Sequence, residues 1–298
     1  MSLERIQLAA GVPTLESLGV ADSEELFRPG GAPDRRGSTP EGRYEARFAA
    51  RDGRATLRYP LPGTPDANGR LSGRPSEVGS GWVVLARWSR PPLRELLRSR
   101  FTQPRSTSLA EREWNLYCRL LDHGVGVPRP LAVGARGRGL FSRESFLVTR
   151  ELQGFEPFEL WARSDTDPGR RRRAANALGL LLSNVIRAGV LLPRLSVDDL
   201  VMKPEPTGEF GASCDDDGPT LPGRMGLRRL PGLALVGLRG GGLRKTLRAE
   251  EVRAMLEHLH GDACARDLVS AREARRIVAL AVRGAGDRRA LWSRLGLG

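Results

Sequence analysis

The sequence has few of the residues that bind metals or form disulfides. Three cysteines and three histidines are scattered over 298 residues, so they form neither a disulfide framework nor a zinc ligand set. No run of 18 apolar residues occurs, which predicts that no helix crosses a membrane. The first residues lack the basic and then apolar pattern of a signal peptide. Together these absences predict a folded cytoplasmic protein.

Lysine is almost absent, although the chain is strongly basic. The formal net charge is +13, and Lys203 and Lys245 are the two lysines among 48 basic residues. Such a bias can reflect a GC-rich genome, or it can serve an acidic partner: anionic lipid, a phosphorylated ligand or nucleic acid. The arginine runs at residues 35–36 and 170–173 are expected to be solvated faces rather than binding sites.

Periodicity predicts strands first and helices later. Strands are expected at residues 44–49, 55–59, 81–89, 131–134 and 145–149, with a helix at 109–121 inserted after the third strand. Later helices are expected at 158–163, 171–187, 250–258, 271–282 and 287–295, with strands at 200–202 and 233–238. We therefore predict an N-terminal extension (1–42, with a short helix at 15–27), an N-lobe (43–152) and a C-lobe (153–298).

One carboxylate falls on the apolar stripe of the helix at 109–121. Leu109, Leu116 and Leu120 define that stripe, and Glu113 is spaced to lie on it. Ser108, followed three residues later by a glutamate, predicts a capping box at the start of the helix. Because a buried carboxylate costs stability unless it is paired, Glu113 is expected to have a cationic partner.

The order of these elements, together with four stretches, resembles the lipopolysaccharide core (heptose/Kdo) kinase family. The stretches are VVLARWSRPPL (83–93), SLAEREWNLYCRLLDHGVGVPRPLAVG (108–134), SFLVTRELQG (145–154) and AGVLLPRLSVDDLVM (188–202). The resemblance covers about residues 81–295. It implies an α+β, bilobal protein-kinase-like fold, with an antiparallel N-lobe sheet, one inserted helix and a mainly helical C-lobe.

The chemistry that the resemblance implies is mostly missing. The phosphate-binding lysine position holds Ala86, and its partner glutamate matches Glu113. In the catalytic loop, Leu192 and Arg194 stand at the His and Asp positions, although a permanent cation cannot accept a proton.

The two metal positions of the family are also changed. Asp199 stands at the Asn position and Gly237 at the second metal position. Asp199 is a possible Mg²⁺ ligand, and the adjacent Asp198 is a possible replacement carboxylate. Residues 134–139 (GARGRG) are expected to form a hairpin turn, and the cluster at 215–217 (DDD) a solvated loop.

These replacements favour a catalytically inactive pseudokinase with a regulatory or ligand-binding role. Arg194 is then free to pair with Glu113 or with an anionic ligand. Two alternatives stay open: a divergent ATP-dependent sugar kinase that phosphorylates lipopolysaccharide core or a related glycan, and a basic module that binds anionic membrane or nucleic acid. ATP and Mg²⁺ are possible cofactors. A protein or an anionic small ligand is the expected partner, nucleic acid is disfavoured, and contact with the inner membrane would be peripheral.

Overall fold

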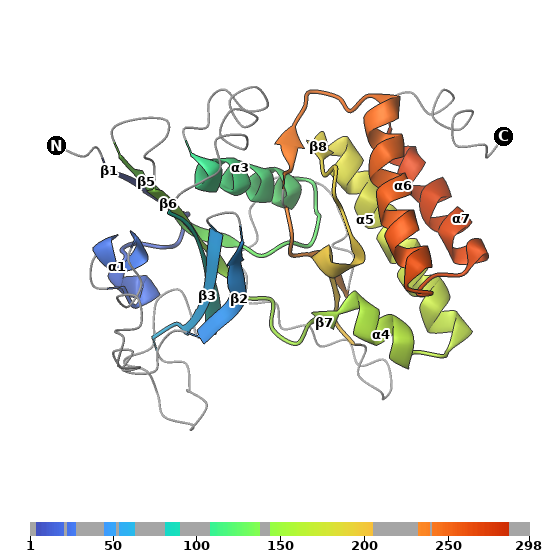
Figure 1. Ribbon diagram of the computed structural model, residues 1–298, viewed down its shortest axis with the longest axis horizontal. Coiled ribbons are helices and arrows are strands. Elements are labelled where there is room, and N and C mark those ends of the chain that lie inside the picture. The colour runs from blue at the N-terminus through green and yellow to red at the C-terminus, as the bar shows by residue number, and fades with distance from the viewer. Residues whose placement is uncertain are drawn as a thin grey trace. The chain divides into compact units, whose positions relative to one another are not determined.

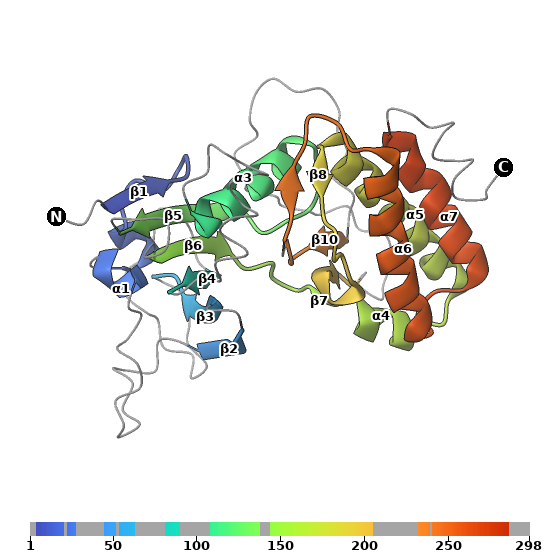
Figure 2. The same cartoon turned by 45° about the horizontal axis from the view of Figure 1, so that its top comes forward.

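The computed structural model contains two compact units. They comprise Met1–Arg119, Pro128–Gln153 and Gly240–Arg244 in unit 1, and Leu120–Val127, Gly154–Arg239 and Lys245–Gly298 in unit 2. The structure describes residues 4–20, 23–27, 45–51, 54–62, 81–89, 108–137, 144–204, 232–238 and 240–285 (Figures 1 and 2). Within these ranges no helix is both long and apolar enough to cross a bilayer.

Unit 1 is built on a six-stranded antiparallel sheet with the order β1-β5-β6-β4-β3-β2. The strands are β1 (Glu4–Leu8), β2 (Glu45–Arg51), β3 (Arg54–Pro60), β4 (Trp82–Trp88), β5 (Pro130–Arg136) and β6 (Glu144–Arg150). Helix α3 (Leu109–Asp122) follows β4 in the chain. The predicted antiparallel sheet is confirmed, and α3 is the predicted helix that follows its third predicted strand.

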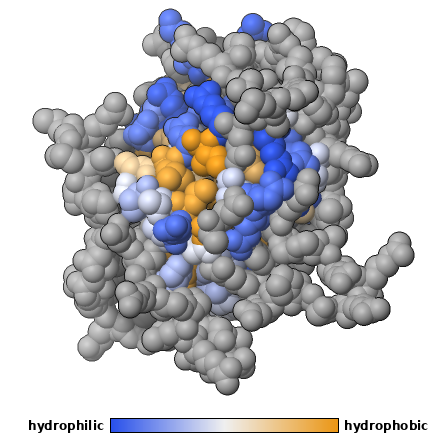
Figure 3. Space-filling model, turned by 90° about the vertical axis from the view of Figure 1, so that its left-hand side faces the viewer, coloured by the Kyte–Doolittle hydropathy of each residue, from blue (hydrophilic) through white to orange (hydrophobic). Residues whose placement is uncertain are grey.

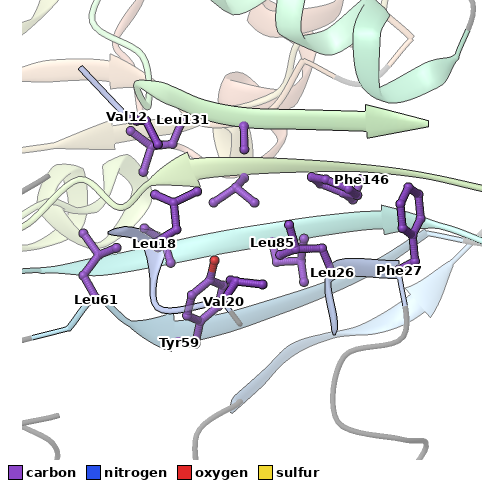
Figure 4. Packing of buried hydrophobic residues seen from close by; sticks show 13 residues of the cluster. Val12, Leu18, Val20, Leu26, Phe27, Tyr59, Leu61, Leu85, Leu131 and Phe146 are labelled. Carbon is purple, nitrogen blue, oxygen red and sulfur yellow. The ribbon is translucent and has the colours of Figure 1, made fainter. Parts of the chain in front are cut away.

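The N-terminal segment covers one face of this sheet. Strand β1, which the sequence did not predict, pairs with β5, and Phe27 packs edge-on against Phe146 of β6 with ring centroids 4.9 Å apart. Side chains of this segment form a buried cluster with side chains of β3, β4, β5 and β6 (Figure 4). Figure 3 views this end of the molecule, where apolar side chains gather between hydrophilic ones. Residues 4–20 and 23–27 therefore contribute to the core of unit 1.

The predicted helix at 15–27 is two short helices instead. The 3₁₀ helix η1 (Glu16–Leu18) ends at Gly19, whose φ of 73° is left-handed, and α1 (Ser23–Phe27) follows. A left-handed residue stops a helix, which explains the interruption.

Unit 2 is mainly helical. Its helices are α4 (Phe158–Ser164), α5 (Pro168–Arg187), α6 (Ala249–Ala265), α7 (Ala271–Ala281) and the 3₁₀ turns η3 (Val197–Asp199) and η4 (Val282–Gly284). Asp167 caps α5 by accepting from the backbone N–H groups of Gly169 and Arg170, and Pro168 occupies the first turn. The strands β7 (Glu156–Pro157), β9 (Leu200–Met202) and β10 (Leu233–Leu235) form a small sheet in the order β10-β9-β7. The predicted α+β class is confirmed.

Several local predictions need correction. The strand expected at 233–238 ends at Leu235, and β5 continues to Arg136, inside the turn expected at 134–139. The run 170–173 is not simply a solvated face, because Arg171 donates to Glu273, to Ala162 O and to Leu268 O. It thereby ties α5 to three neighbouring segments. The helix expected at 287–295 and the acidic cluster at 215–217 lie outside the described residues.

Candidate functional site

The loop that matches the family's catalytic loop lies in unit 2. It runs from β8 (Val190–Leu191) through a turn at Arg194 and the 3₁₀ turn η3 to β9. Leu192 and Leu195 are buried and hold the turn to the core, whereas Arg194 is exposed. Arg194 forms no hydrogen bond or ion pair with any other residue that the structure describes. At the position of the family's base, the loop thus presents a solvated guanidinium.

Asp199 is built into the backbone of this loop. Its Oδ2 accepts from the N–H of Ser196 at 3.0 Å and from the Ser196 hydroxyl at 3.2 Å, which closes a capping box around η3. Its own carbonyl accepts from the N–H of Val236 at 2.9 Å. The residue at the family's Asn position therefore has a structural task, because it caps η3 and joins the loop to the segment after β10.

Gly237, at the second metal position, faces Asp199 directly. A Cβ placed on Gly237 would overlap Oδ1 of Asp199 and lie 2.7 Å from its Cγ. Real carbon atoms do not approach so closely, so the carboxylate of Asp199 fills the space that a side chain at 237 would need. In the family, both positions carry a metal ligand. Here the carboxylate of Asp199 is the only such side chain at the two positions, and it fills the space beside Gly237.

Asp198 is held in an ion-pair network around Arg266, the C-cap residue of α6 (Ala249–Ala265). Arg266 donates to both oxygens of Asp198 at 2.6 and 2.9 Å, to Glu159 of α4 at 2.7 Å and to Asp262 at 3.1 Å. Asp262 in turn accepts from the N–H of Val197 at 2.8 Å. Hydrogen bonds to Asp198 and Glu159 raise the pKa of Arg266 above its ordinary value. The network fastens the loop to α4 and α6.

These carboxylates do not fit a Mg²⁺ site. Mg²⁺ requires several oxygen ligands around an octahedron, with carboxylates that face the ion. Asp198 instead faces a guanidinium and Asp199 a serine, while Gly237 offers no ligand. Across the described ranges, no three His, Cys, Asp or Glu side chains are grouped so that they could hold a metal ion.

In unit 1, the position of the family's lysine is a buried alanine, but its glutamate is paired. Ala86 of β4 is 4% exposed. Glu113 of α3 is also buried, and both of its carboxylate oxygens accept from Arg54 of β3, at 3.1 and 3.2 Å. This pair meets the expectation that Glu113 has a cationic partner. The partner is Arg54 and not Arg194, which the sequence analysis named.

The sequence analysis did not predict Arg54, because the family's cation is a lysine and the chain has no lysine before Lys203. The signal was present in the neighbouring strand, where the period of two places Arg54, Thr56 and Arg58 on one face and the apolar residues between them on the other. Arg58 makes a similar contact: its Nε donates to Glu151 at 2.8 Å, and its guanidinium lies 3.9 Å from the ring centroid of Trp82. The same face of the sheet therefore carries two stacked arginines.

Comparison with known proteins agrees with this architecture. Residues 65–204 match the model of the lipopolysaccharide kinase (Kdo/WaaP) family. A solved structure described as "WaaP in complex with acyl carrier protein" matches with a TM-score of 0.57 and 18% identity, over 98% of this chain and 94% of that chain. No curated protein matches the sequence. The chain thus has a protein-kinase-like fold, and over residues 65–204 it is similar to the lipopolysaccharide kinase (Kdo/WaaP) family.

Proposed function

We propose that this chain is a lipopolysaccharide-kinase-like pseudokinase with a regulatory or ligand-binding role. The observation that carries the proposal is the way the carboxylates of the loop are used. Asp199 caps Ser196 and fills the space at Gly237, and Asp198 is paired with Arg266. Phosphoryl transfer needs carboxylates that hold Mg²⁺ and a group that orients the acceptor hydroxyl. Arg194, at the position of that group, can bind an anion but cannot accept a proton.

The direct test is a phosphotransfer assay beside a thermal-shift titration. The full chain is mixed with ATP and Mg²⁺, and both release of phosphate and transfer to a lipopolysaccharide core acceptor are measured. A pseudokinase gives neither above the background of an Arg194→Ala variant, and any shift of Tm with ATP persists in EDTA. Transfer that requires Mg²⁺ and is lost in Asp199→Ala would contradict the proposal.

That contrary result would establish the second candidate, a divergent ATP-dependent sugar kinase. In this reading Asp199 would leave its cap on Ser196 to ligate Mg²⁺, with Asp198 as the second carboxylate. A third candidate, a basic module that binds anionic membrane or nucleic acid, predicts no shift of Tm with ATP under either condition. Binding to anionic vesicles that falls steeply with salt would support it.

We also propose a protein partner for the chain. The structural match is to a protein solved in complex with acyl carrier protein, and the chain carries a net charge of +13. A strongly basic surface favours acidic partners through long-range attraction, and salt weakens that attraction. An acyl carrier protein is therefore the first partner to test, by calorimetry at low and at physiological ionic strength. Equal affinity at both would contradict an electrostatic docking mode.

The division of the chain and its location are further proposals. We propose an N-terminal extension (1–42), an N-lobe (43–152) and a C-lobe (153–298), in a cytoplasmic protein that contacts the inner membrane peripherally. The basic charge supports the last point, because each Lys or Arg near an anionic surface contributes about 1 kcal/mol. Fractionation of cells tests it: the chain should leave the membrane pellet at high salt without detergent.

A further inference from the structure

One face of the sheet in unit 1 carries a cation close to the alanine that replaces the family's lysine. In the pairing of β3 with β4, Thr56 lies opposite Ala86 and Arg54 lies opposite Trp88. Directly opposed residues share a face of an antiparallel sheet, and so do residues two apart on one strand. Arg54 therefore lies on the same face as Ala86. It is on the neighbouring strand, two residues before Thr56, the residue that pairs with Ala86. Glu113 reaches the same face from α3.

The guanidinium of Arg54 is fixed from two sides. It forms a bidentate pair with Glu113 at 3.1 and 3.2 Å, and it lies 4.9 Å from the ring centroid of Trp88. The side chains of Arg54 and Glu113 are 22% and 11% exposed, so the pair is largely shielded from water, yet part of the arginine stays accessible. A planar cation held in this way loses little entropy when it binds a second anion.

Arg54 has donors to spare. A guanidinium carries five N–H groups, and the pair with Glu113 uses one from each terminal nitrogen. Its buried Nε has no hydrogen-bond partner among the described residues. In kinase folds, a cation that is paired with the glutamate of this helix holds the phosphates of the nucleotide. Arg54 is the first residue of β3.

We propose that Arg54 is a relocated phosphate-binding cation, and that unit 1 binds the polyphosphate of a nucleotide through it, oriented by Glu113 and without a need for Mg²⁺. This inference rests on the proposed ligand-binding role of a pseudokinase. It assigns to the chain an arginine-based contact in place of the lysine that Ala86 has lost. Arg54 suits the task because its fork geometry matches phosphate oxygens.

The test is a calorimetric titration of the full chain with inorganic tripolyphosphate and, separately, with ATP, both in the presence of EDTA. Wild type is expected to bind both probes. Arg54→Gln and the double variant Arg54→Gln/Glu113→Gln should lose about tenfold or more in affinity, the contribution of one charge-assisted contact. The double variant is included because the single change leaves Glu113 buried without its partner, and misfolding would imitate loss of binding. Glu113→Gln alone should bind more weakly than wild type but more tightly than Arg54→Gln, because Arg54 keeps its charge and loses the carboxylate that orients it.

Arg136 of β5 provides a matched control. It lies in the same unit, pairs with Glu24 and Glu144, and stacks on the ring of Phe27 at 4.4 Å, so Arg136→Gln removes a comparable set of contacts from another place. This variant should keep the wild-type affinity for tripolyphosphate. Wild-type affinity in the Arg54→Gln/Glu113→Gln variant, or no binding by wild type, would overturn the inference. The lack of catalytic activity is tested separately and is contradicted by Mg²⁺-dependent phosphotransfer, whereas no binding by wild type removes a nucleotide from the proposed ligand-binding role. If wild type bound ATP but not tripolyphosphate, the inference about Arg54 would also be overturned, because the adenine base and not the phosphates would then be recognised.

Discussion

At the scale of single residues, Asp199 and Gly237 constrain each other. The Asp199 carboxylate lies where a side chain at position 237 would begin, and it is held there by Ser196. Restoring an aspartate at 237 would therefore not restore a metal site, because the new side chain would displace the cap of η3. The glycine at the family's second metal position and the structural use of Asp199 are thus coupled through the packing of this loop.

This coupling predicts a non-additive double-mutant cycle. Gly237→Ala should lower the free energy of unfolding by about 1–3 kcal/mol, the usual cost of forcing a methyl group into a filled space. In an Asp199→Ala background the nearest remaining atom of that residue is its Cβ, 3.2 Å from the new methyl carbon, so the same change should cost about 1 kcal/mol less. Urea denaturation of the four proteins measures the coupling. Strict additivity would show that Asp199 does not occupy this space in solution.

Glu159 is expected to make unit 2 less stable as the pH falls into the acid range. Hydrogen bonds from Arg163 and Arg266 lower the pKa of its carboxyl group below the ordinary 4.5. A group with a lower pKa in the folded state contributes stability above its unfolded pKa and loses it as the pH falls through the folded pKa. The Tm of wild type should therefore exceed that of Glu159→Gln at neutral pH, and the difference should vanish as the pH falls below 4.5. A Tm difference that is the same at pH 3 and pH 7 would contradict this assignment.

At the scale of elements, α5 and α7 approach closely because Gly179 has no side chain. A Cβ on Gly179 would lie 2.6 Å from Cβ of Leu280 and 2.9 Å from the carbonyl oxygen of Ile277. Glycine in a helix interior normally costs about 1 kcal/mol relative to alanine, so its presence needs a packing reason. Gly261 of α6 has no such reason, since a Cβ there would meet nothing within 4 Å.

The two glycines therefore predict opposite responses to the same substitution. Gly179→Ala should destabilise the chain by about 1–3 kcal/mol, because the clash with α7 outweighs the gain in helix propensity. Gly261→Ala should stabilise it by about 0.5–1 kcal/mol, because the propensity gain there is unopposed. Thermal or urea denaturation of the two variants checks both signs in one experiment. If both stabilise, α5 and α7 do not pack as closely as described.

The sequence predicted elements well where one periodicity was unbroken. Helix α3, helix α5 and strand β4 lie within a few residues of their expected bounds, because burial of one face imposes the period that the sequence shows. Strand β1 was missed, because its five residues sit at a sheet edge and depend on pairing with β5. The partner of Glu113 was missed for a related reason: Arg54 is 59 residues away in the chain, and only strand register brings it close.

At the scale of the whole molecule, the sheet of unit 1 is asymmetric. One face carries Arg54, Arg58 and the contact with Glu113, whereas the other packs against apolar side chains of residues 4–20 and 23–27. A polar functional face can be kept on a sheet only if the opposite face supplies enough buried apolar area. The N-terminal segment thus stabilises the sheet that positions Arg54, although it contributes no residue to that ion pair.

Phe27 gives the sharpest test of this dependence. Its ring is fully buried against Phe146, so Phe27→Ala should lower the free energy of unfolding by about 3–5 kcal/mol. Leu160→Ala is the control, because that large apolar side chain is 57% exposed and its loss should change stability by about 0.5 kcal/mol or less. Because the segment supports the Arg54 face, Phe27→Ala should also weaken tripolyphosphate binding in proportion to the fraction unfolded. Weakened binding in a variant of unchanged Tm would instead mean that residues 4–27 shape the phosphate site directly.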